Sequence, residues 1–289
     1  MISTCPVDYQ PPSELEIRIY RRLLKPWRTL LDPQFLNMDR IPTQSPGPLL
    51  FIGNHTLYGL LDVPHLYMEL LQNHGIALRS MGDHAHFRMP GWSEFLQRFG
   101  AVDGTPEVCD DLLGKGEAVL IFPGGAREVA KRKGEKYTLV WKERFGFVKA
   151  AIRHGCTIIP FAMLGGDDAW DIVWDAEDLQ ESPFAGLVNA CYEAFDVPLD
   201  SMVPIAKGLG PSMLPKPVRL YFSLAEPIDA RAWAGREDDQ GALTELRDLV
   251  ADGIYGELDR LVVQRKWDPP VSLRRRLIER LLRSRIGRR

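Results

Sequence analysis

A histidine and an aspartate after an apolar segment are the first residues that could do chemistry. The stretch FIGNHTLYGLLDVP, residues 51–64, carries His55 and, after six intervening residues, Asp62. A neutral imidazole can take a proton from a hydroxyl group near pH 7, because its ordinary pKa is about 6.5. A carboxylate beside it fixes the tautomer and stabilises the imidazolium that forms. The pair predicts general-base chemistry; the alternative is that His55 is a structural histidine.

A second candidate is a glycine-rich turn followed by basic residues, FPGGAREVAKRKGEKY at residues 122–137. Gly124 and Gly125 would let a ligand approach the backbone closely, or let the chain take a positive φ. Arg127 follows directly after this turn and Ala126. Backbone N–H groups and a guanidinium together suit a phosphate or a developing oxyanion. The same pattern also occurs in ordinary turns that carry a surface arginine.

A third stretch, GDHAHFRMPGW at residues 82–92, contains two histidines and an arginine. His84 and His86 could ligate a metal ion, but no third ligand lies nearby in the sequence, so we predict no metal site. Arg88 is the better candidate, as a contact for an anion.

Several common catalytic motifs are absent from the sequence. There is no G-x-S-x-G nucleophile elbow, which disfavours an α/β-hydrolase. There is no G-x-x-x-x-G-K-[ST] phosphate loop and no G-x-G-x-x-G after a strand, which disfavours NTPases and dinucleotide enzymes. The three stretches above therefore remain the candidates.

These residues must be positioned by the apolar segments around them. Runs that suit strands buried on both faces occur at residues 48–53, 76–82, 117–125, 156–166 and 218–224. Helical patterns occur at residues 13–31, 63–75, 146–155 and 239–265. This alternation predicts an α/β fold with a mainly parallel sheet flanked by helices. Since such sheets gather their sites at strand ends, GNH and FPGG are expected in one crevice.

We predict one α/β domain over residues 1–271, because no stretch has the composition of a linker. Its N-terminal helical stretch, 13–31, is expected to be broken by Pro26. Residues 165–216 are less regular and are expected to form a lid or a pocket wall. The helix at 239–265 should end at KWDPP, because the residue before a proline is disfavoured in a helix.

The composition is that of an ordinary globular protein. The 289 residues are 45% hydrophobic and 26% charged, so disorder is not expected. The four cysteines are far apart, which indicates free thiols in a reducing compartment rather than disulfides or a zinc site. No apolar run reaches the roughly 18 residues that span a bilayer, and no signal-peptide core is present. We therefore expect a cytoplasmic protein, soluble or peripheral.

Positive charge is concentrated at the C-terminus. Residues 272–289 hold eight arginines and one glutamate, a local charge of +7, whereas the whole chain carries −3. Leucines and isoleucines share one face of a helix through this segment, which predicts a basic amphipathic helix on the anionic inner face of a membrane. The alternative is that this face packs on the body of the protein. Nucleic-acid binding is not expected, because the segment has no aromatic residue to stack on bases.

Taken in order, these motifs resemble those of the glycerolipid acyltransferase superfamily, the lysophospholipid acyltransferase-like proteins. In that family an NH…D motif ends one strand, an FPEG-T-R block ends a later strand, and a VPIVP-like strand follows. The corresponding stretches here are NH at 54–55 with Asp62, FPGGAR at 122–127 and TIIPF at 157–161. The resemblance covers roughly residues 45–170, and the predicted helix near 240–265 also suits the family.

Two departures from the family pattern are informative. Six residues, not four, separate His55 from Asp62, so the sequence leaves open whether the two side chains meet. Gly124 stands where phospholipid-making members carry Glu, and Ala126 replaces Thr. The block FPGGAREV more closely resembles the branch related to diacylglycerol acyltransferases and phytyl-ester synthases, whose acceptors are neutral lipid alcohols.

The resemblance implies an acyl-CoA-dependent O-acyltransferase that acts on a hydroxyl group of a lipid alcohol. His55 would be the general base, and Asp62 would orient it. Backbone N–H groups around Gly124 and Gly125 would stabilise the oxyanion. Acyl-CoA is then a co-substrate, and no cofactor, metal or covalent acyl-enzyme is implied.

The same resemblance makes Arg127, and also Arg88, candidates to bind a phosphate of CoA or of the acceptor. One alternative is a lysophospholipid (lysophosphatidic acid) acyltransferase, and another is a thioesterase in which water replaces the alcohol. A third alternative is a non-catalytic lipid-binding protein with a degenerate site.

Overall fold

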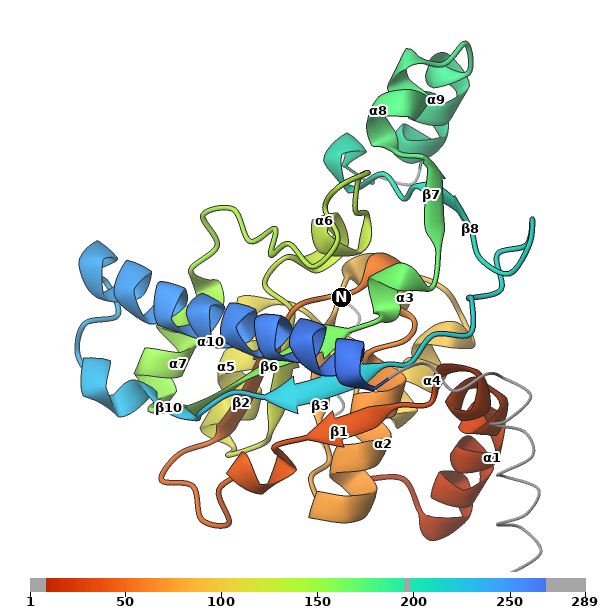
Figure 1. Ribbon diagram of the computed structural model, residues 1–289. Coiled ribbons are helices and arrows are strands. Elements are labelled where there is room, and N and C mark those ends of the chain that lie inside the picture. The colour runs from red at the N-terminus through yellow and green to blue at the C-terminus, as the bar shows by residue number, and fades with distance from the viewer. Residues whose placement is uncertain (1–8, 195–197, 269–289) are drawn as a thin grey trace, which may run out of the picture.

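The computed structural model describes residues 9–194 and 198–268, and an eight-stranded sheet lies at its centre (Figure 1). The strands are β1 (Gln34–Leu36), β2 (Leu49–Gly53), β3 (Arg79–Gly82), β4 (Val102–Asp103), β5 (Val119–Ile121), β6 (Thr157–Leu164), β9 (Tyr221–Leu224) and β10 (Ile228–Asp229). The spatial order is β1, β9, β6, β2, β5, β3, β4, and β10 pairs with β6. Only the pairs β6–β9 and β6–β10 are antiparallel. The predicted mainly parallel α/β fold is confirmed, and each predicted apolar run contributes a strand.

Helices cover both faces of this sheet. One face carries α5 (Pro106–Gly114), α7 (Gly146–His154) and α10 (Gln240–Trp267), and the other carries α1 (Glu14–Leu31) and α2 (Val63–His74). Figure 1 shows α10 lying across its face of the sheet. Alternate side chains of a strand point to opposite faces. Leu50 and Ile52 therefore pack with α5, α7 and α10, whereas Phe51 packs with α1 and α2.

The longer helices lie close to their predicted bounds. Helices α2 and α7 end at Gly75 and Gly155, whose φ values of 68° and 58° close the last turn in the left-handed region. The predicted break at Pro26 is wrong, because α1 runs through this residue to Leu31. Leu24 and Leu31 are buried on either side of the proline, and their packing offsets the backbone hydrogen bond that a proline cannot donate.

The segment predicted to be irregular, residues 165–216, contains regular elements in its described part. β7 (Asp171–Trp174) and β8 (Ile205–Lys207) form a small antiparallel sheet, and α8 (Ala176–Glu181) and α9 (Ala185–Ala194) follow β7. Figure 1 shows α8 and α9 projecting from the body of the molecule. The segment's role as a lid or pocket wall stays a prediction.

Two predictions about the ends of the chain are not tested by the described residues. The basic helix predicted at 272–289 lies outside the described residues. A single domain over residues 1–271 also stays a prediction. Within the two described ranges, no helix combines the length and the apolarity that crossing a membrane requires.

Candidate active site

Three neighbouring parallel strands carry the predicted site residues at their carboxyl ends. β2 pairs with β5, and β5 pairs with β3, so the residues that follow these strands emerge at the same edge of the sheet. His55 follows β2 and Phe122 follows β5, and their rings stack with centroids 3.9 Å apart and planes 9° from parallel. The GNH and FPGG motifs therefore meet in one place, as predicted.

His55 and Asp62 also meet, despite the six residues between them. His55 Nδ1 and Asp62 Oδ2 are 2.6 Å apart. The intervening chain forms the 3₁₀ helix η2 (Leu57–Gly59), and Tyr58 and Gly59 both have φ of 65°. This tight turn takes up the extra residues and returns the carboxylate to the imidazole. Because Nδ1 is engaged, Nε2 is the nitrogen left to face a substrate hydroxyl.

Asp62 is held by several donors at once. Its Oδ2 also accepts hydrogen bonds from the Thr56 N–H at 3.0 Å and the Thr56 hydroxyl at 3.2 Å, and its Oδ1 accepts from the Val63 N–H at 2.9 Å. Burial raises the pKa of the Asp62 carboxyl, but the His55 imidazole and these backbone donors outweigh burial and lower the pKa to about 2. Asp62 is therefore an anion at neutral pH, as a group that orients and stabilises an imidazolium should be.

Two further polar residues hold the loop that carries His55, and the sequence analysis missed both roles. The buried Asn54 side chain bonds both backbone groups of Met163 on β6, accepting from its N–H at 2.7 Å and donating to its carbonyl at 2.9 Å. Asp167, in η3 (Gly166–Asp168), accepts from the N–H groups of Leu57 at 2.8 Å and Tyr137 at 2.9 Å. A buried polar residue at a strand end was the available signal for Asn54.

Gly59 lies against the catalytic face of the imidazole. A Cβ at this position would be 2.7 Å from His55 Cε1 and 3.0 Å from His55 Nε2. The positive φ of Gly59 also favours glycine. The absence of a side chain at residue 59 therefore leaves space beside the nitrogen that would act as the base.

The two glycines of the FPGG turn differ in conformation. Gly125 has a φ of 49°, and its N–H donates to the Phe122 carbonyl at 3.0 Å. Gly124 has ordinary right-handed helical angles, φ −70° and ψ −23°. The N–H of Gly125 is thus already used within the turn. The oxyanion-binding role of the two glycines stays a prediction.

Arg127 and Arg88 lie in different surroundings. The Arg127 guanidinium is buried and makes a two-pronged ion pair with Glu135, at 2.6 and 3.0 Å. Arg88 is exposed and follows α3 (His84–Phe87), at the end of β3. Their roles as phosphate contacts stay predictions, and for Arg127 a substrate would have to share or displace Glu135. In the described part of the chain, no group of three or more His, Cys, Asp or Glu residues could hold a metal.

Comparisons with known proteins match this arrangement. A family model described as Acyltransferase matches residues 33–164. Phytyl ester synthase 1, chloroplastic, from Arabidopsis thaliana is 29% identical over 244 residues, which are 80% of this chain and 34% of that protein. A Bos taurus protein named DGAT1/2-independent enzyme synthesizing storage lipids is 34% identical over 125 residues, 43% of this chain and 36% of that protein. Residues 33–164, which hold both motifs, therefore match the Acyltransferase family.

The predicted resemblance to the glycerolipid acyltransferase superfamily is thereby confirmed. The chain spans about a third of the length of the two curated relatives. The crystal structure of the 1-acyl-sn-glycerophosphate (LPA) acyltransferase PlsC from Thermotoga maritima superposes with a TM-score of 0.54 at 15% identity. The superposition covers 86% of this chain and 78% of that one. At this identity the likeness shows the acyltransferase fold alone.

A pocket of about 490 Å³ lies beside the acyltransferase motifs. Phe122, whose ring stacks on His55, forms part of its wall together with Pro123. The remaining wall combines apolar side chains with Thr105, the acidic Asp110 and three basic residues, Arg144, Lys149 and Arg153. This volume falls within the range of about 300–1,000 Å³ that is typical of ligand pockets.

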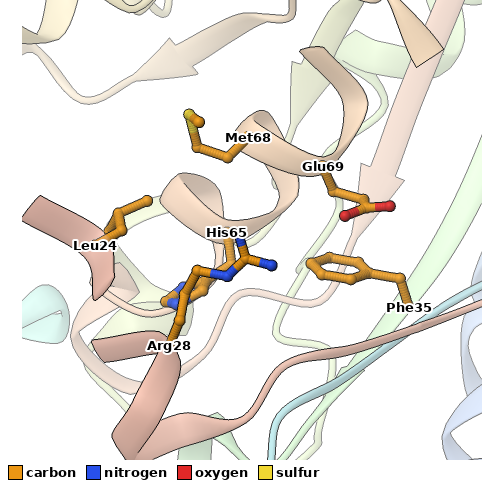
Figure 2. A pocket seen from close by; sticks show the side chains of 6 residues that line it. All are labelled: Leu24, Arg28, Phe35, His65, Met68 and Glu69. Atoms are coloured by element: carbon orange, nitrogen blue, oxygen red, sulfur yellow. The ribbon is translucent and has the colours of Figure 1, made fainter. Parts of the chain in front are cut away.

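A second cavity is much smaller and lies between α1 and α2. Figure 2 shows the side chains that line it, which are Leu24, Arg28, Phe35, His65, Met68 and Glu69. Its volume of about 10 Å³ is close to that needed for one water molecule. His65 is buried there, and burial lowers its pKa to about 4. His65 is therefore neutral at pH 7, and none of the predicted site residues lines this cavity.

Proposed function

We propose that the protein transfers a fatty acyl group from acyl-CoA to a hydroxyl group of a neutral lipid alcohol, with His55 as the general base. The observation that carries the proposal is the pair of His55 Nδ1 and Asp62 Oδ2 at 2.6 Å. A carboxylate on Nδ1 keeps the proton on that nitrogen, so Nε2 has a lone pair for the acceptor hydroxyl. The match to the Acyltransferase family supplies the reaction class.

In the proposed reaction, His55 Nε2 takes the hydroxyl proton as the acceptor oxygen attacks the thioester carbonyl carbon. A C–O bond forms, and the carbonyl electron pair moves onto oxygen. When the tetrahedral intermediate collapses, the C–S bond breaks and the imidazolium returns its proton to the CoA thiolate. Asp62 stabilises the imidazolium between these two steps.

The pocket beside Phe122 is the proposed site of the acyl-CoA donor. Its apolar lining suits an acyl or pantetheine chain, and its three basic side chains suit the phosphates of CoA. Two of these side chains lie near acidic partners, since Arg153 contacts Asp110 at 2.5 Å and Lys149 lies 3.5 Å from Asp238. A phosphate of CoA would therefore share Lys149 and Arg153 with these two carboxylates. Because Phe122 belongs both to the pocket and to the His55 stack, a thioester held there would lie beside the base.

Two observations favour a neutral acceptor over lysophosphatidic acid, the alternative within the superfamily. The arginine of the FPGG block already has a carboxylate partner, Glu135. The two relatives described above carry names that refer to phytyl esters and to storage lipids. The contact between His55 and Asp62 argues against the non-catalytic alternative, a lipid-binding protein with a degenerate site.

The test is CoA release from palmitoyl-CoA by the purified protein, with monoacylglycerol, diacylglycerol, a long-chain alcohol or lysophosphatidic acid as acceptor. We expect release that depends on a neutral acceptor and falls by about 10²–10⁴-fold in His55→Ala. Release with lysophosphatidic acid alone would identify the phospholipid branch, and release without acceptor would identify a thioesterase. Near-normal turnover by folded His55→Ala would contradict the mechanism.

We further propose that the protein works in the cytoplasm at an anionic membrane, to which residues 272–289 would bind. The described residues add a supporting feature in α1. Leu15, Ile19 and Leu23 are exposed along one side of this helix, and Arg18 and Arg22 are exposed beside them. Apolar and basic side chains together suit a lipid surface. Co-sedimentation with anionic liposomes should fall when residues 272–289 are removed, and equal binding by both forms would exclude that segment as an anchor.

A further inference from the structure

Glu128 is a buried acid that the mechanism above does not use. It lies in α6 (Gly125–Val129), and its side chain is 0% exposed. Neither carboxyl oxygen has a hydrogen-bond partner within the described residues. Native proteins pair nearly all of their buried polar groups, because an unpaired one is strongly unfavourable. A carboxyl group in this condition therefore needs an explanation outside stability.

The position of the Glu128 side chain accounts for Gly124. A Cβ at residue 124 would lie 2.0 Å from Glu128 Oε2 and 2.4 Å from Glu128 Cβ, so no larger residue fits beside it. The backbone at residue 124 does not require glycine, since φ −70° and ψ −23° are open to any L-residue. Residue 124 is therefore a glycine for reasons of space, and the side chain that takes this space is Glu128.

In the family pattern that this sequence resembles, the phospholipid-making members carry glutamate at residue 124. Here the side chain of Glu128, one helical turn further along, occupies the space that a Cβ at residue 124 would take. Gly124 thus lacks the acid of the FPEG pattern, and Glu128 supplies a carboxyl group beside it.

The surroundings of this carboxyl group link it to His55. α6 packs against η2, the turn that follows His55, and the charged or titratable groups that act on the Glu128 carboxyl are Lys131, His55 and Asp167. Burial raises the pKa of the Glu128 carboxyl to about 7. The charge of Lys131, the charge of His55 and the nearby backbone N–H of His55 act to lower this pKa, and Asp167 acts to raise it. Its ionised form is therefore available near neutral pH, although burial disfavours it.

We propose that Glu128 is a second acidic positioning residue for His55, which supplies from α6 the carboxyl group that the superfamily's second block carries at position 124. The proposal rests on the proposed acyl transfer. When His55 becomes an imidazolium, the Glu128 carboxylate and the Asp62 carboxylate both stabilise it through a buried, low-dielectric environment. No bond forms to Glu128, and the proton passes from His55 to the leaving thiolate as before.

The first test is Glu128→Gln, which keeps the shape of the side chain and removes its charge. We expect kcat to fall by roughly 10- to 100-fold while KM for both substrates changes by less than about threefold. An exposed glutamate at the end of α8 provides the matched control, so Glu181→Gln should leave kcat and KM unchanged. An unchanged kcat in Glu128→Gln would overturn the proposal.

The second test needs no activity and separates a functional acid from a structural one. The folded-state pKa of Glu128 is raised, so ionisation penalises the folded protein as pH rises from about 4.5 through 7. At about pH 8, Glu128→Gln should raise the Tm by about 2 °C or more, and the gain should shrink towards pH 5. A lowered Tm at pH 8 would mean that Glu128 holds the fold together, and would overturn the proposal even if the wild type releases no CoA.

The third test moves the acid back to position 124. Glu128→Gly should lose as much kcat as Glu128→Gln, and the double variant Gly124→Glu/Glu128→Gly, which also removes the Cβ of residue 128, should regain most of the loss. Gly124→Glu alone should lower the Tm, because two side chains would then compete for one space. A folded double variant that is no faster than Glu128→Gly would refute the exchange of positions. If the double variant does not fold, the first two tests decide.

An inactive wild type with every acceptor would instead count against the proposed acyl transfer. Wild-type release that depends on His55, together with an unchanged Glu128→Gln, would count against the role of Glu128 alone. The two failures are therefore distinguishable.

Discussion

Asp62 and Glu128 are both fully buried acids beside one histidine, yet their environments are opposite. Asp62 accepts hydrogen bonds from the Thr56 N–H and hydroxyl and from the Val63 N–H, and lies 2.6 Å from the imidazole of His55. Glu128 has no hydrogen-bond partner among the described residues. The pKa of Asp62 is lowered to about 2, and that of Glu128 is raised to about 7.

The difference follows from where each acid lies relative to a helix. Asp62 caps the N-terminus of α2, where backbone N–H groups have no partner within the helix. Glu128 lies inside α6, where the Glu128 N–H bonds the Gly124 carbonyl and the Ala130 N–H bonds the Ala126 carbonyl. Burial alone therefore does not set the state of an acid. Nearby donors keep Asp62 ionised and stabilising. At Glu128 the one backbone N–H that acts on the carboxyl, that of His55, is outweighed by burial, so the pKa stays near 7.

The largest expected effect comes from removing the charge of Asp62, the acid that pairs with His55. Asp62→Asn keeps the size of the side chain and removes the charge that orients His55, so we expect kcat to fall by about 10²–10⁴-fold. Unlike Glu128→Gln, it should also lower the free energy of unfolding, by about 2–4 kcal/mol, because a buried charge pair is broken. Steady-state kinetics and urea unfolding at pH 7 measure the two losses.

The loss of stability in Asp62→Asn should depend on pH differently from the change in Glu128→Gln. The folded-state pKa of Asp62 lies below its ordinary value of 3.8, so its stabilisation is present above about pH 4 and is lost as pH falls through about 2. A shift of this size corresponds to roughly 2 kcal/mol. The stability gap between wild type and Asp62→Asn should narrow in acid, whereas the gap for Glu128→Gln changes between about pH 5 and 8. A gap for Asp62→Asn that widens in acid would contradict this account.

The sequence was sufficient to predict the sheet, because strands buried on both faces appear as uninterrupted apolar runs. It was also sufficient to predict that His55 and FPGG meet, since parallel strands bring their carboxyl ends to one edge. It left the His55–Asp62 contact open, because residue spacing alone does not reveal the tight turn at Tyr58 and Gly59, where φ is 65°. Helix α1 was predicted to break at Pro26 because the buried contacts on either side of the proline are not visible in a local pattern.

Glu128 could not be predicted as a site residue, for a different reason. It lies in the run AREVAKRKGEK, where acidic and basic residues alternate as they do on solvated surfaces. Its burial depends on the packing of α6 against other parts of the chain, among them η2, the turn that follows His55. Asp167 was missed in the same way, since it lies beside Asp168 in a loop that looks exposed, yet it is only 2% exposed and bonds Leu57 and Tyr137.

A smaller effect is expected from Gly59→Ala, which acts on the histidine without touching either acid. The new Cβ would lie 2.7 Å from His55 Cε1 and 3.0 Å from His55 Nε2, so the imidazole would have to move. We expect kcat to fall by roughly 10- to 100-fold, because displacement of a catalytic group by about 1 Å is costly. Positive φ at alanine should also lower the free energy of unfolding by about 1–2 kcal/mol.

Gly75→Ala is the matched control, since Gly75 has φ of 68° and an added Cβ there would meet no atom within 4 Å. It should show a similar loss of stability and an unchanged kcat. Equal loss of kcat in both variants would mean that backbone strain, rather than the contact with His55, lowers activity.

The smallest effect should come from the proposed donor pocket, whose wall includes neither Asp62 nor Glu128. Gly146 lines this pocket at the start of α7, and an added Cβ would meet no atom within 4 Å. Gly146→Trp should therefore fill part of the pocket without disturbing the fold. We expect KM for palmitoyl-CoA to rise by about three- to tenfold, with KM for a short-chain acyl-CoA changed much less, because lost apolar burial scales with the length of the chain.

Gly146→Ala keeps the pocket open and separates the effect of bulk from that of a more helix-favouring residue. It should behave as wild type at every chain length. In both variants the free energy of unfolding should depend on pH as it does in the wild type, because neither Asp62 nor Glu128 lines the pocket. If Gly146→Trp and Gly146→Ala give the same KM for long and short donors, the acyl chain binds elsewhere. The effects of Asp62, Glu128 and Gly59 on His55 would then still stand, because they depend only on contacts around the imidazole.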